Sequence, residues 1–160
     1  MKKLVVLALL AAGFYLFGIS ESNAADTAQI SVTVTLQSIS ISVTPTSWAI
    51  GTVIAESSHE SDIYTVTNDG NVTENIAIQC GNSANWTVVG TITTTNQFKM
   101  EARGGDLGTA YTSIHTSQTL KSNLASGGTV NDLQLRFTAP QAGSNTTEQT
   151  IPVTLTATAP

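Results

Sequence analysis

The chain has 160 residues and a net charge of −5, and only 11% of its residues are charged, well below the roughly 25% usual for globular domains. Affinity for nucleic acid depends on many basic contacts to phosphate. An acidic chain with few basic residues is therefore not expected to bind nucleic acid or an anionic membrane. The length fits a single domain behind a short leader.

The first 24 residues have the pattern of a secretory signal peptide. Lys2 and Lys3 precede an apolar run, Leu4–Ile19, and Ser22-Asn23-Ala24 supplies small residues where signal peptidase reads them. We expect a helical signal peptide over residues 1–24, with cleavage after Ala24. The alternative is an uncleaved anchor, but the apolar run is shorter than the roughly 18–20 residues of a spanning helix. The predicted protein is therefore secreted or at the cell surface, after periplasmic transit if the cell has an outer membrane.

Removal of residues 1–24 leaves a chain with a net charge of −6, because two lysines and one glutamate leave with the leader. The remaining basic residues do not cluster along the sequence: Lys99, Arg103, Lys121 and Arg136. Thr and Ser fill the polar positions instead, which suits the solvent face of strands. It also suits a surface that packs against copies of itself.

Residues 25–37 are predicted to be an N-terminal strand or arm. Apolar residues alternate at even positions, Ile30, Val32, Val34 and Leu36, and then at odd positions from Ile39 to Val43. Side chains in a strand point alternately to its two faces, so the change of phase at Gln37-Ser38 divides the stretch. We expect the part after Ser38 to belong to the chain's own sheet. For Ile30–Leu36 two alternatives remain: a first strand with a bulge, or a strand given to another copy.

Short alternating segments separated by turn residues follow, and no amphipathic helix appears. Asp69-Gly70 is a turn signal and predicts a hairpin between the strands around it, while residues 56–60 read as a polar loop and residues 110–125 show no clear period. This pattern predicts an all-β, immunoglobulin-like β-sandwich of about seven to nine strands over residues 38–160. The expected strands after Val43 are Ile63–Asn68, Asn75–Cys80, Trp86–Val89, Gln97–Ala102, Asp132–Thr138 and Gln149–Thr158.

Three segments also carry a resemblance. Trp48–Val53 is an aromatic-x-x-Gly-Thr-Val motif, Thr67–Asn71 ends a strand with Thr-Asn-x-Gly-Asn, and LQLRFTAPQAGSNTTEQTIPVTLTATA reads as two final strands. Together they resemble exported bacterial immunoglobulin-like β-sandwich modules, over roughly half of the chain beyond the leader. The resemblance implies a structural or adhesive role for a surface or filament-type secreted protein.

No pattern in the sequence predicts catalysis, a cofactor or a metal. Ser58, His59, Glu60 and Asp62 are neighbours in a polar segment, whereas a catalytic triad needs geometry set by separate elements. One cysteine and two histidines do not make a structural zinc site, and the isolated aspartates do not form a calcium loop. Cys80 shares the parity of Ile76 and Ile78, so it is predicted to be buried in a strand.

Three Asn-x-Thr sequons lie in or beside predicted turns, where glycan acceptors are accessible: Asn71, Asn85 and Asn145. The two tryptophans, Trp48 and Trp86, lie in phase with strand cores, so burial is favoured over a sugar-binding platform.

These observations predict a secreted, non-enzymatic structural protein of the cell surface. Its filament would assemble when Ile30–Leu36 adds to a sheet edge of another copy, since main-chain hydrogen bonds give such pairing affinity and alternate side chains give it specificity. The expected partner is the protein itself, as a homopolymer. The alternative is an adhesive or carbohydrate-binding module whose partner is a surface polysaccharide, with Tyr64, Trp86 and Tyr111 as the aromatic residues to test.

Overall fold

A computed structural model describes residues 28–160, so the predicted signal peptide and its cleavage site lie outside the described residues. The chain divides into two units, residues 1–34 and residues 35–160. The described part of the first unit, residues 28–34, contains no strand and is exposed throughout.

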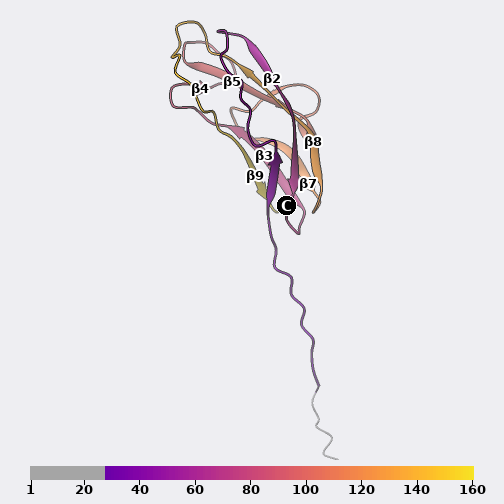
Figure 1. The fold of residues 1–160 in the computed structure, drawn as a ribbon. Helices are drawn as coiled ribbons and strands as arrows, with labels where there is room; N and C mark the ends of the chain where they lie inside the picture. The colour runs from indigo at the N-terminus through magenta and orange to yellow at the C-terminus, as the bar shows by residue number, and fades with distance from the viewer. Residues whose placement is uncertain (1–27) are drawn as a thin grey trace, which may run out of the picture. The chain divides into compact units, whose positions relative to one another are not determined.

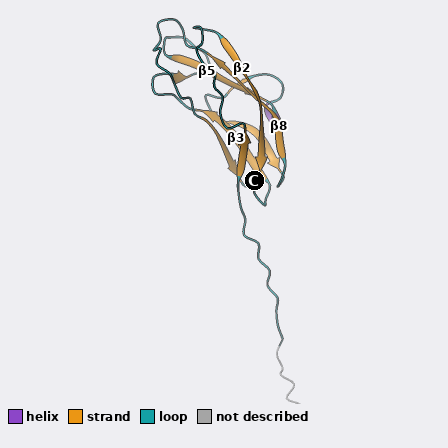
Figure 2. Cartoon of the chain, in the orientation of Figure 1, coloured by secondary structure: helices purple, strands orange, loops and turns teal. Residues whose placement is uncertain are grey.

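The second unit is all-β, with nine strands and one short 3₁₀ helix, η1 (Gly105–Leu107), and the described residues contain no α-helix. The all-β class and the predicted number of strands are therefore confirmed, and Figure 2 shows strands joined by loops and turns. The strands are β1 (Ile41–Thr44), β2 (Ser58–Asn68), β3 (Glu74–Cys80), β4 (Thr87–Val88), β5 (Gln97–Arg103), β6 (Thr112–Ser113), β7 (Gln118–Leu124), β8 (Thr129–Thr138) and β9 (Val153–Thr158).

The strands form two sheets (Figure 1). The larger sheet has the order β1-β2-β8-β5-β4, with β6 also paired to β5, and the smaller sheet has the order β7-β3-β9. All pairings are antiparallel except that of β4 with β5. The edges of the two sheets are therefore formed by short strands or by β7 and β9.

The strand order departs from that of an immunoglobulin constant domain, whose sheets contain strands ABED and CFG. When the two-residue strands β4 and β6 are set aside, the seven longer strands take the letters A to G in chain order. The larger sheet then reads A-B-F-D and the smaller sheet E-C-G. The fifth and sixth strands have exchanged sheets, and the third strand is central in the smaller sheet.

The hairpin predicted around Asp69-Gly70 is wrong, because β2 and β3 lie in different sheets. β2 already has β1 and β8 as its two neighbours, so β3 cannot pair with it. The turn instead binds the segment that precedes β1. The backbone N–H groups of Asp69 and Gly70 donate to the carbonyl of Ser40, at 2.8 and 3.1 Å. A turn signal predicts a change of direction, and it does not determine which strands pair.

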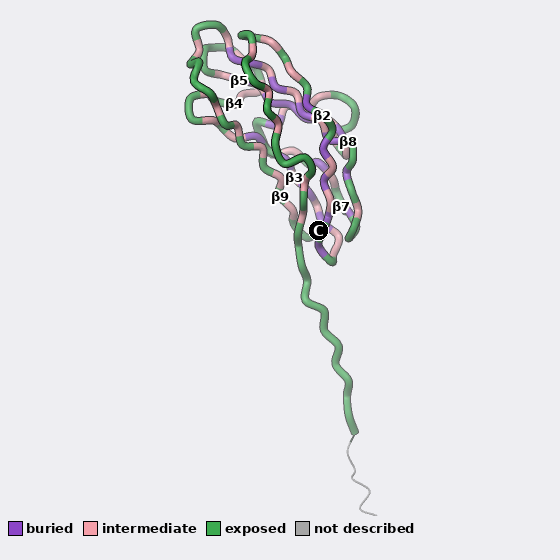
Figure 3. The backbone as a smooth tube through the Cα atoms, in the orientation of Figure 1, coloured by how far each residue is buried: buried purple, intermediate pink, exposed green. Residues whose placement is uncertain are grey.

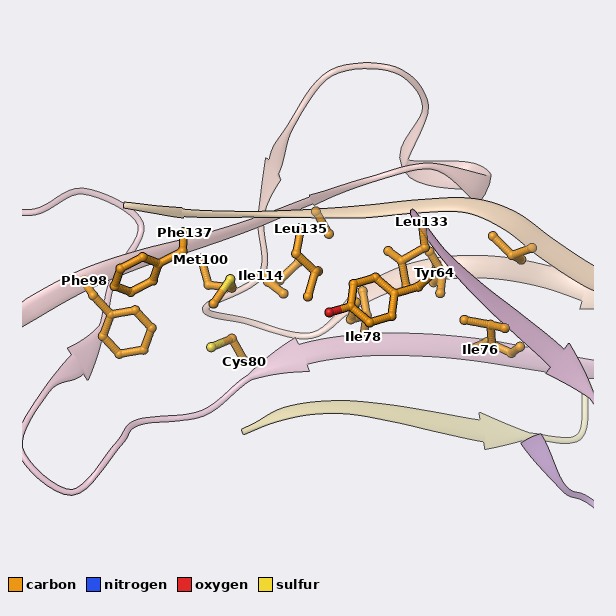
Figure 4. Packing of buried hydrophobic residues seen from close by; sticks show 14 of the residues in the cluster. Tyr64, Ile76, Ile78, Cys80, Phe98, Met100, Ile114, Leu133, Leu135 and Phe137 are labelled. Atoms are coloured by element: carbon orange, nitrogen blue, oxygen red, sulfur yellow. The ribbon is translucent and has the colours of Figure 1, made fainter. Parts of the chain in front are cut away.

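The core lies between the two sheets and follows the alternation of the sequence (Figure 4). As predicted, Phe98, Met100 and Ala102 of β5 are buried, and so are Leu133, Leu135 and Phe137 of β8. Cys80 is 1% exposed and is free, which confirms its predicted core position. Its burial raises the pKa of the thiol to about 12.

Several predicted boundaries are wrong. β2 begins at Ser58, inside the segment expected to be a polar loop, and residues 110–125 contain β6 and β7. The strands expected at Trp86–Val89 and Gln149–Thr158 shorten to β4 and β9, and residues 29–40 carry no strand assignment. The polar start of β2 forms because its main chain pairs with β8, with Ser58 opposite Thr138 and Glu60 opposite Arg136. Main-chain pairing does not depend on apolar side chains.

Candidate functional site

The four arm residues identified from the sequence are among the most exposed large apolar side chains of the described residues. Their exposed fractions are 90% for Ile30, 78% for Val32, 86% for Val34 and 87% for Leu36. None of these residues belongs to a strand. Figure 3 shows the same exposure along the described residues that precede β1, residues 28–40. The described residues of the chain therefore leave this apolar row uncovered.

The chain between the arm and β1 is held by the turn after β2. The Asn71 side chain donates from Nδ2 to the carbonyl of Leu36 at 2.8 Å, and its Oδ1 accepts the N–H of Ser38 at 2.8 Å. The backbone N–H of Asn71 also donates a hydrogen bond to the carbonyl of Ser38 at 3.1 Å. We call these residues, together with Ser40 and Glu74, the arm anchor.

Glu74 completes the arm anchor from a fully buried position. Its side chain is 0% exposed, and Oε1 accepts the N–H of Ser40 at 2.8 Å. The other oxygen, Oε2, is buried without a hydrogen-bond partner among the described residues. A buried carboxylate that binds a backbone N–H holds that segment firmly, because an alternative position would leave both groups unpaired.

Two strands at sheet edges present free main-chain groups, β1 and β9. In an antiparallel pair the residues alternate between those whose N–H and C=O point to the partner and those whose groups point away. Ser40 accepts the N–H of Asp69, so Ser40 occupies a hydrogen-bonded position of the pairing with β2. Ile41 and Val43 occupy the alternate positions, and their main-chain groups point away from β2. Both side chains are half-buried and pack against the core.

The three predicted glycan acceptors are exposed and lie apart from one another in the chain. Asn71 has both polar ends of its side chain engaged in the arm anchor. Asn145 accepts the N–H of Thr147 at 2.8 Å through Oδ1. Glycosylation at any of the three stays a prediction.

The basic residues beyond the leader are scattered in the sequence, but three of the four gather on the outer face of the larger sheet: Lys99, Arg103 and Arg136. Glu101 is 4% exposed and pairs with Lys99 at 2.7 Å and with Arg136 at 2.7 Å. Arg103 and Arg136 both lie over the ring of Tyr111, at 4.8 and 4.2 Å from its centroid. β5 and β8 are neighbours, so residues more than 30 positions apart in the sequence share this face.

The aromatic side chains do not form an exposed platform. Tyr64 is buried, and Trp86 is half-buried with its ring stacked on Phe137 at 6.3 Å between centroids. The indole N–H of Trp86 donates to the carbonyl of Asn145 at 3.0 Å. Trp48 is also half-buried and packs against the core, as the sequence predicted for both tryptophans.

The polar residues considered for chemistry serve local structure. His59 shares a hydrogen bond with Ser57 at 3.0 Å, whereas Ser58 bonds to Thr138 at 2.9 Å. His115 bonds to Ser113, and Asp132 accepts the N–H of Gly105. Within residues 28–160, no three side chains of the His, Cys, Asp and Glu types group together as metal ligands would.

Comparison of the chain with models of known protein families, with curated proteins and with solved structures finds no match in any of the three. Over the described residues, no helix has the length and apolar character needed to cross a membrane. The class that the structure defines is an all-β domain of two packed sheets, preceded by an exposed apolar segment.

Proposed function

We propose that this chain is a secreted, non-enzymatic structural protein of the cell surface, and that its copies form a filament by N-terminal strand donation. The observation that carries the proposal is the row of four exposed apolar side chains at alternate positions, Ile30, Val32, Val34 and Leu36. Fully burying one such side chain contributes about 1.5–3 kcal/mol. A segment that leaves all four in water gains that stabilisation only when a partner covers them.

The form of the segment favours a sheet edge as that partner. Polar residues Ser31, Thr33 and Thr35 separate the apolar ones, so an extended segment presents one apolar and one polar face. Exposed alternating segments pair readily with free strand edges. The segment contains no charged residue that pairing would remove from water.

Export and the family relationship are part of the same proposal. The signal-peptide pattern of residues 1–24 supports secretion, and the low charge supports a surface that packs against copies of itself. A relationship to exported immunoglobulin-like modules rests on two motifs and on the two final strands of the sequence. Trp48–Val53 supplies half-buried residues that pack against the core, and Thr67–Asn71 supplies the turn of the arm anchor. The strand order departs from that of an immunoglobulin domain, so the proposed relationship is to a variant of that class.

The alternative role as an adhesive or carbohydrate-binding module draws no support from the aromatic residues. Tyr64 is buried, Trp86 stacks within the core, and Tyr111 lies beneath two arginines. A sugar platform needs aromatic faces open to the ligand.

Deletion of residues 26–37 tests the proposal. We expect the parent protein to give SDS-resistant multimers on a gel and large species in light scattering, and the deletion variant to be a monomer. A parent protein that is monomeric, or multimers that survive the deletion, would overturn strand donation.

A matched pair of point variants separates strand donation from loss of solubility. Val32→Asp places a charge on the apolar face and is expected to abolish the multimers. Thr33→Asp places the same charge on the adjacent, outward position and is expected to leave them. Equal effects of the two variants would contradict a paired strand, because neighbouring side chains of a strand point to opposite faces. Specific retention of the monomer on a polysaccharide column would favour the alternative role.

A further inference from the structure

We propose that the outer edge of β9 is the acceptor for the arm of a second copy, with Ile30–Leu36 pairing beside Val153–Thr158. This inference rests on the proposed strand donation and adds its receiving site. It follows from the direction of the main-chain groups of β9, from the partial burial of its side chains, and from what occupies the other sheet edges.

The main chain of β9 has one satisfied side and one open side. The N–H of Gly81 donates to the carbonyl of Pro152 at 2.9 Å, and the register continues with Thr154, Thr156 and Thr158 opposite β3. These residues therefore direct their N–H and C=O groups to β3. The residues between them, Val153, Leu155 and Ala157, direct theirs to the empty side. Among the described residues, no hydrogen bond is formed to those outward groups.

The side chains of the same three residues are only half covered. Burial along β9 alternates between intermediate and exposed, whereas the inward positions of β3 are fully buried (Figure 3). Val153 and Leu155 nevertheless pack against the core. A strand placed beside β9 would thus extend the smaller sheet and cover the uncovered part of these side chains.

The other long edge of the smaller sheet is closed. η1 lies against β7, where the side chain of Asp106 accepts the N–H of Ser122 at 2.7 Å and the ammonium of Lys121 at 2.7 Å. Gly105 sits so close to the carbonyl of Leu120 that a Cβ would not fit. A charged side chain and a helical turn on a strand edge are devices that prevent pairing.

The edges of the larger sheet are too short for the arm. β4 and β6 have two residues each, and β1 has four, of which Ile41 and Val43 direct groups outward. β9 has six residues, and three of them direct groups outward. Ile30–Leu36 has seven residues, one more than β9. Both segments are free of charge, so their pairing removes no ion from water.

The alternation sets the relative register. Inward residues of the arm must lie opposite inward residues of β9 for both to face the core. An antiparallel register with Val34 opposite Leu155 brings Leu36 opposite Val153 and Val32 opposite Ala157. In this register Thr33 lies opposite Thr156 on the outer face, at a non-hydrogen-bonded position. Such pairs have Cα atoms about 4.5 Å apart, which is within the range of a disulfide.

Disulfide trapping between two variants tests the acceptor. Chains carrying Thr33→Cys are co-expressed with chains carrying Thr156→Cys, and the full-length protein is oxidised. We expect a band at twice the monomer mass that disappears on reduction. Thr154→Cys and Thr158→Cys replace Thr156→Cys to cover registers shifted by two residues. Cys80 remains in place because it is buried, and the parent protein controls for any disulfide through it.

Matched controls place cysteine at positions on the competing edges that are exposed like Thr156, namely Thr119 of β7 and Ser42 of β1. Trapping with Ser42→Cys or Thr119→Cys and not with the β9 variants would overturn β9 as the acceptor, while strand donation would stand. Trapping only when both cysteines are in one chain would show that the arm pairs within its own molecule. If multimers depend on residues 26–37 and no β9 variant is trapped, the acceptor proposal fails. If the parent protein is monomeric, the proposed function itself fails.

Discussion

Ser38 and Asn71 are joined by a hydrogen bond in each direction. The N–H of Ser38 donates to the side-chain oxygen of Asn71 at 2.8 Å, and the N–H of Asn71 donates to the carbonyl of Ser38 at 3.1 Å. The pair lies where the phase of the apolar alternation changes. It thereby separates a segment held by the domain, from Ser38 onward, from the exposed row that precedes it.

The first prediction concerns this arm anchor. Asn71→Ala removes the bonds to Leu36 and to the N–H of Ser38, and we expect a loss of about 1–2 kcal/mol in the free energy of unfolding. Urea denaturation measures it, and amide exchange at Ser38 should accelerate. Asn85→Ala, at another exposed sequon, is the matched control and should change stability by less than about 0.5 kcal/mol. Equal losses for the two variants would contradict the anchor.

The second prediction concerns Glu101. Glu101→Gln keeps the shape of the side chain and removes the negative charge that pairs with Lys99 and Arg136. Arg103 and Arg136, which both lie over Tyr111, then lack that neighbouring negative charge. The carboxylate is nearly buried and its partners are partly exposed, so we expect a loss of about 1–3 kcal/mol, between the values for surface and buried pairs. The loss, measured by urea denaturation, should shrink as salt is raised because salt screens the repulsion. A loss that grows with salt would refute this account.

The third prediction concerns acid stability at Asp106. The hydrogen bond from Lys121, followed by the one from the N–H of Ser122, holds the pKa of this carboxyl below its ordinary value of 3.8. A lowered pKa in the folded state stabilises the fold above the unfolded value, and this contribution is lost as the pH falls through the folded pKa. As the pH falls below about 4, the free energy of unfolding should therefore decrease less for Asp106→Asn than for the parent protein.

The measurement is the free energy of unfolding between pH 2 and 5, together with the carboxyl titration of Asp106 by NMR. Lys121→Gln removes the larger cause and keeps the bond from Ser122, so the pKa of Asp106 should rise part of the way. A carboxyl that titrates at or above its ordinary value in the parent protein would contradict the prediction.

The fourth prediction concerns the thiol of Cys80. Burial raises its pKa from 9.0 to about 12, so the thiolate that reacts with alkylating reagents is scarce at neutral pH. We expect iodoacetamide to leave the folded protein unmodified at pH 8 and to modify it fully in urea, as measured by mass spectrometry. The unfolded chain ionises first, so this group also lowers stability as the pH rises from about 9 to 12. Rapid alkylation of the folded protein would show that Cys80 is accessible.

The candidate site was partly predictable from the sequence. The alternation at Ile30–Leu36 identified the exposed row, because a period of two in apolar residues is visible without any neighbour. The anchor at Asn71 and Glu74 was not predicted, since its bonds run to main-chain groups more than 30 residues away. The turn signal at Asp69-Gly70 was the one local indication of it.

The parity of apolar residues predicts correctly which side chains of β5 and β8 face the core. Five side chains are buried as their parity predicts: Phe98, Met100, Leu133, Leu135 and Phe137. Alternate residues of a strand lie on the same face, so the two faces can be read from the residues of that strand alone. Which strands are neighbours is seen only in the folded chain. The strand neighbours explain why β2 and β3 do not pair and why β9 has an open edge. They also bring three basic residues together around Glu101 and Tyr111. The physical reason is that strands pair through main-chain N–H and C=O groups, which nearly every residue carries alike.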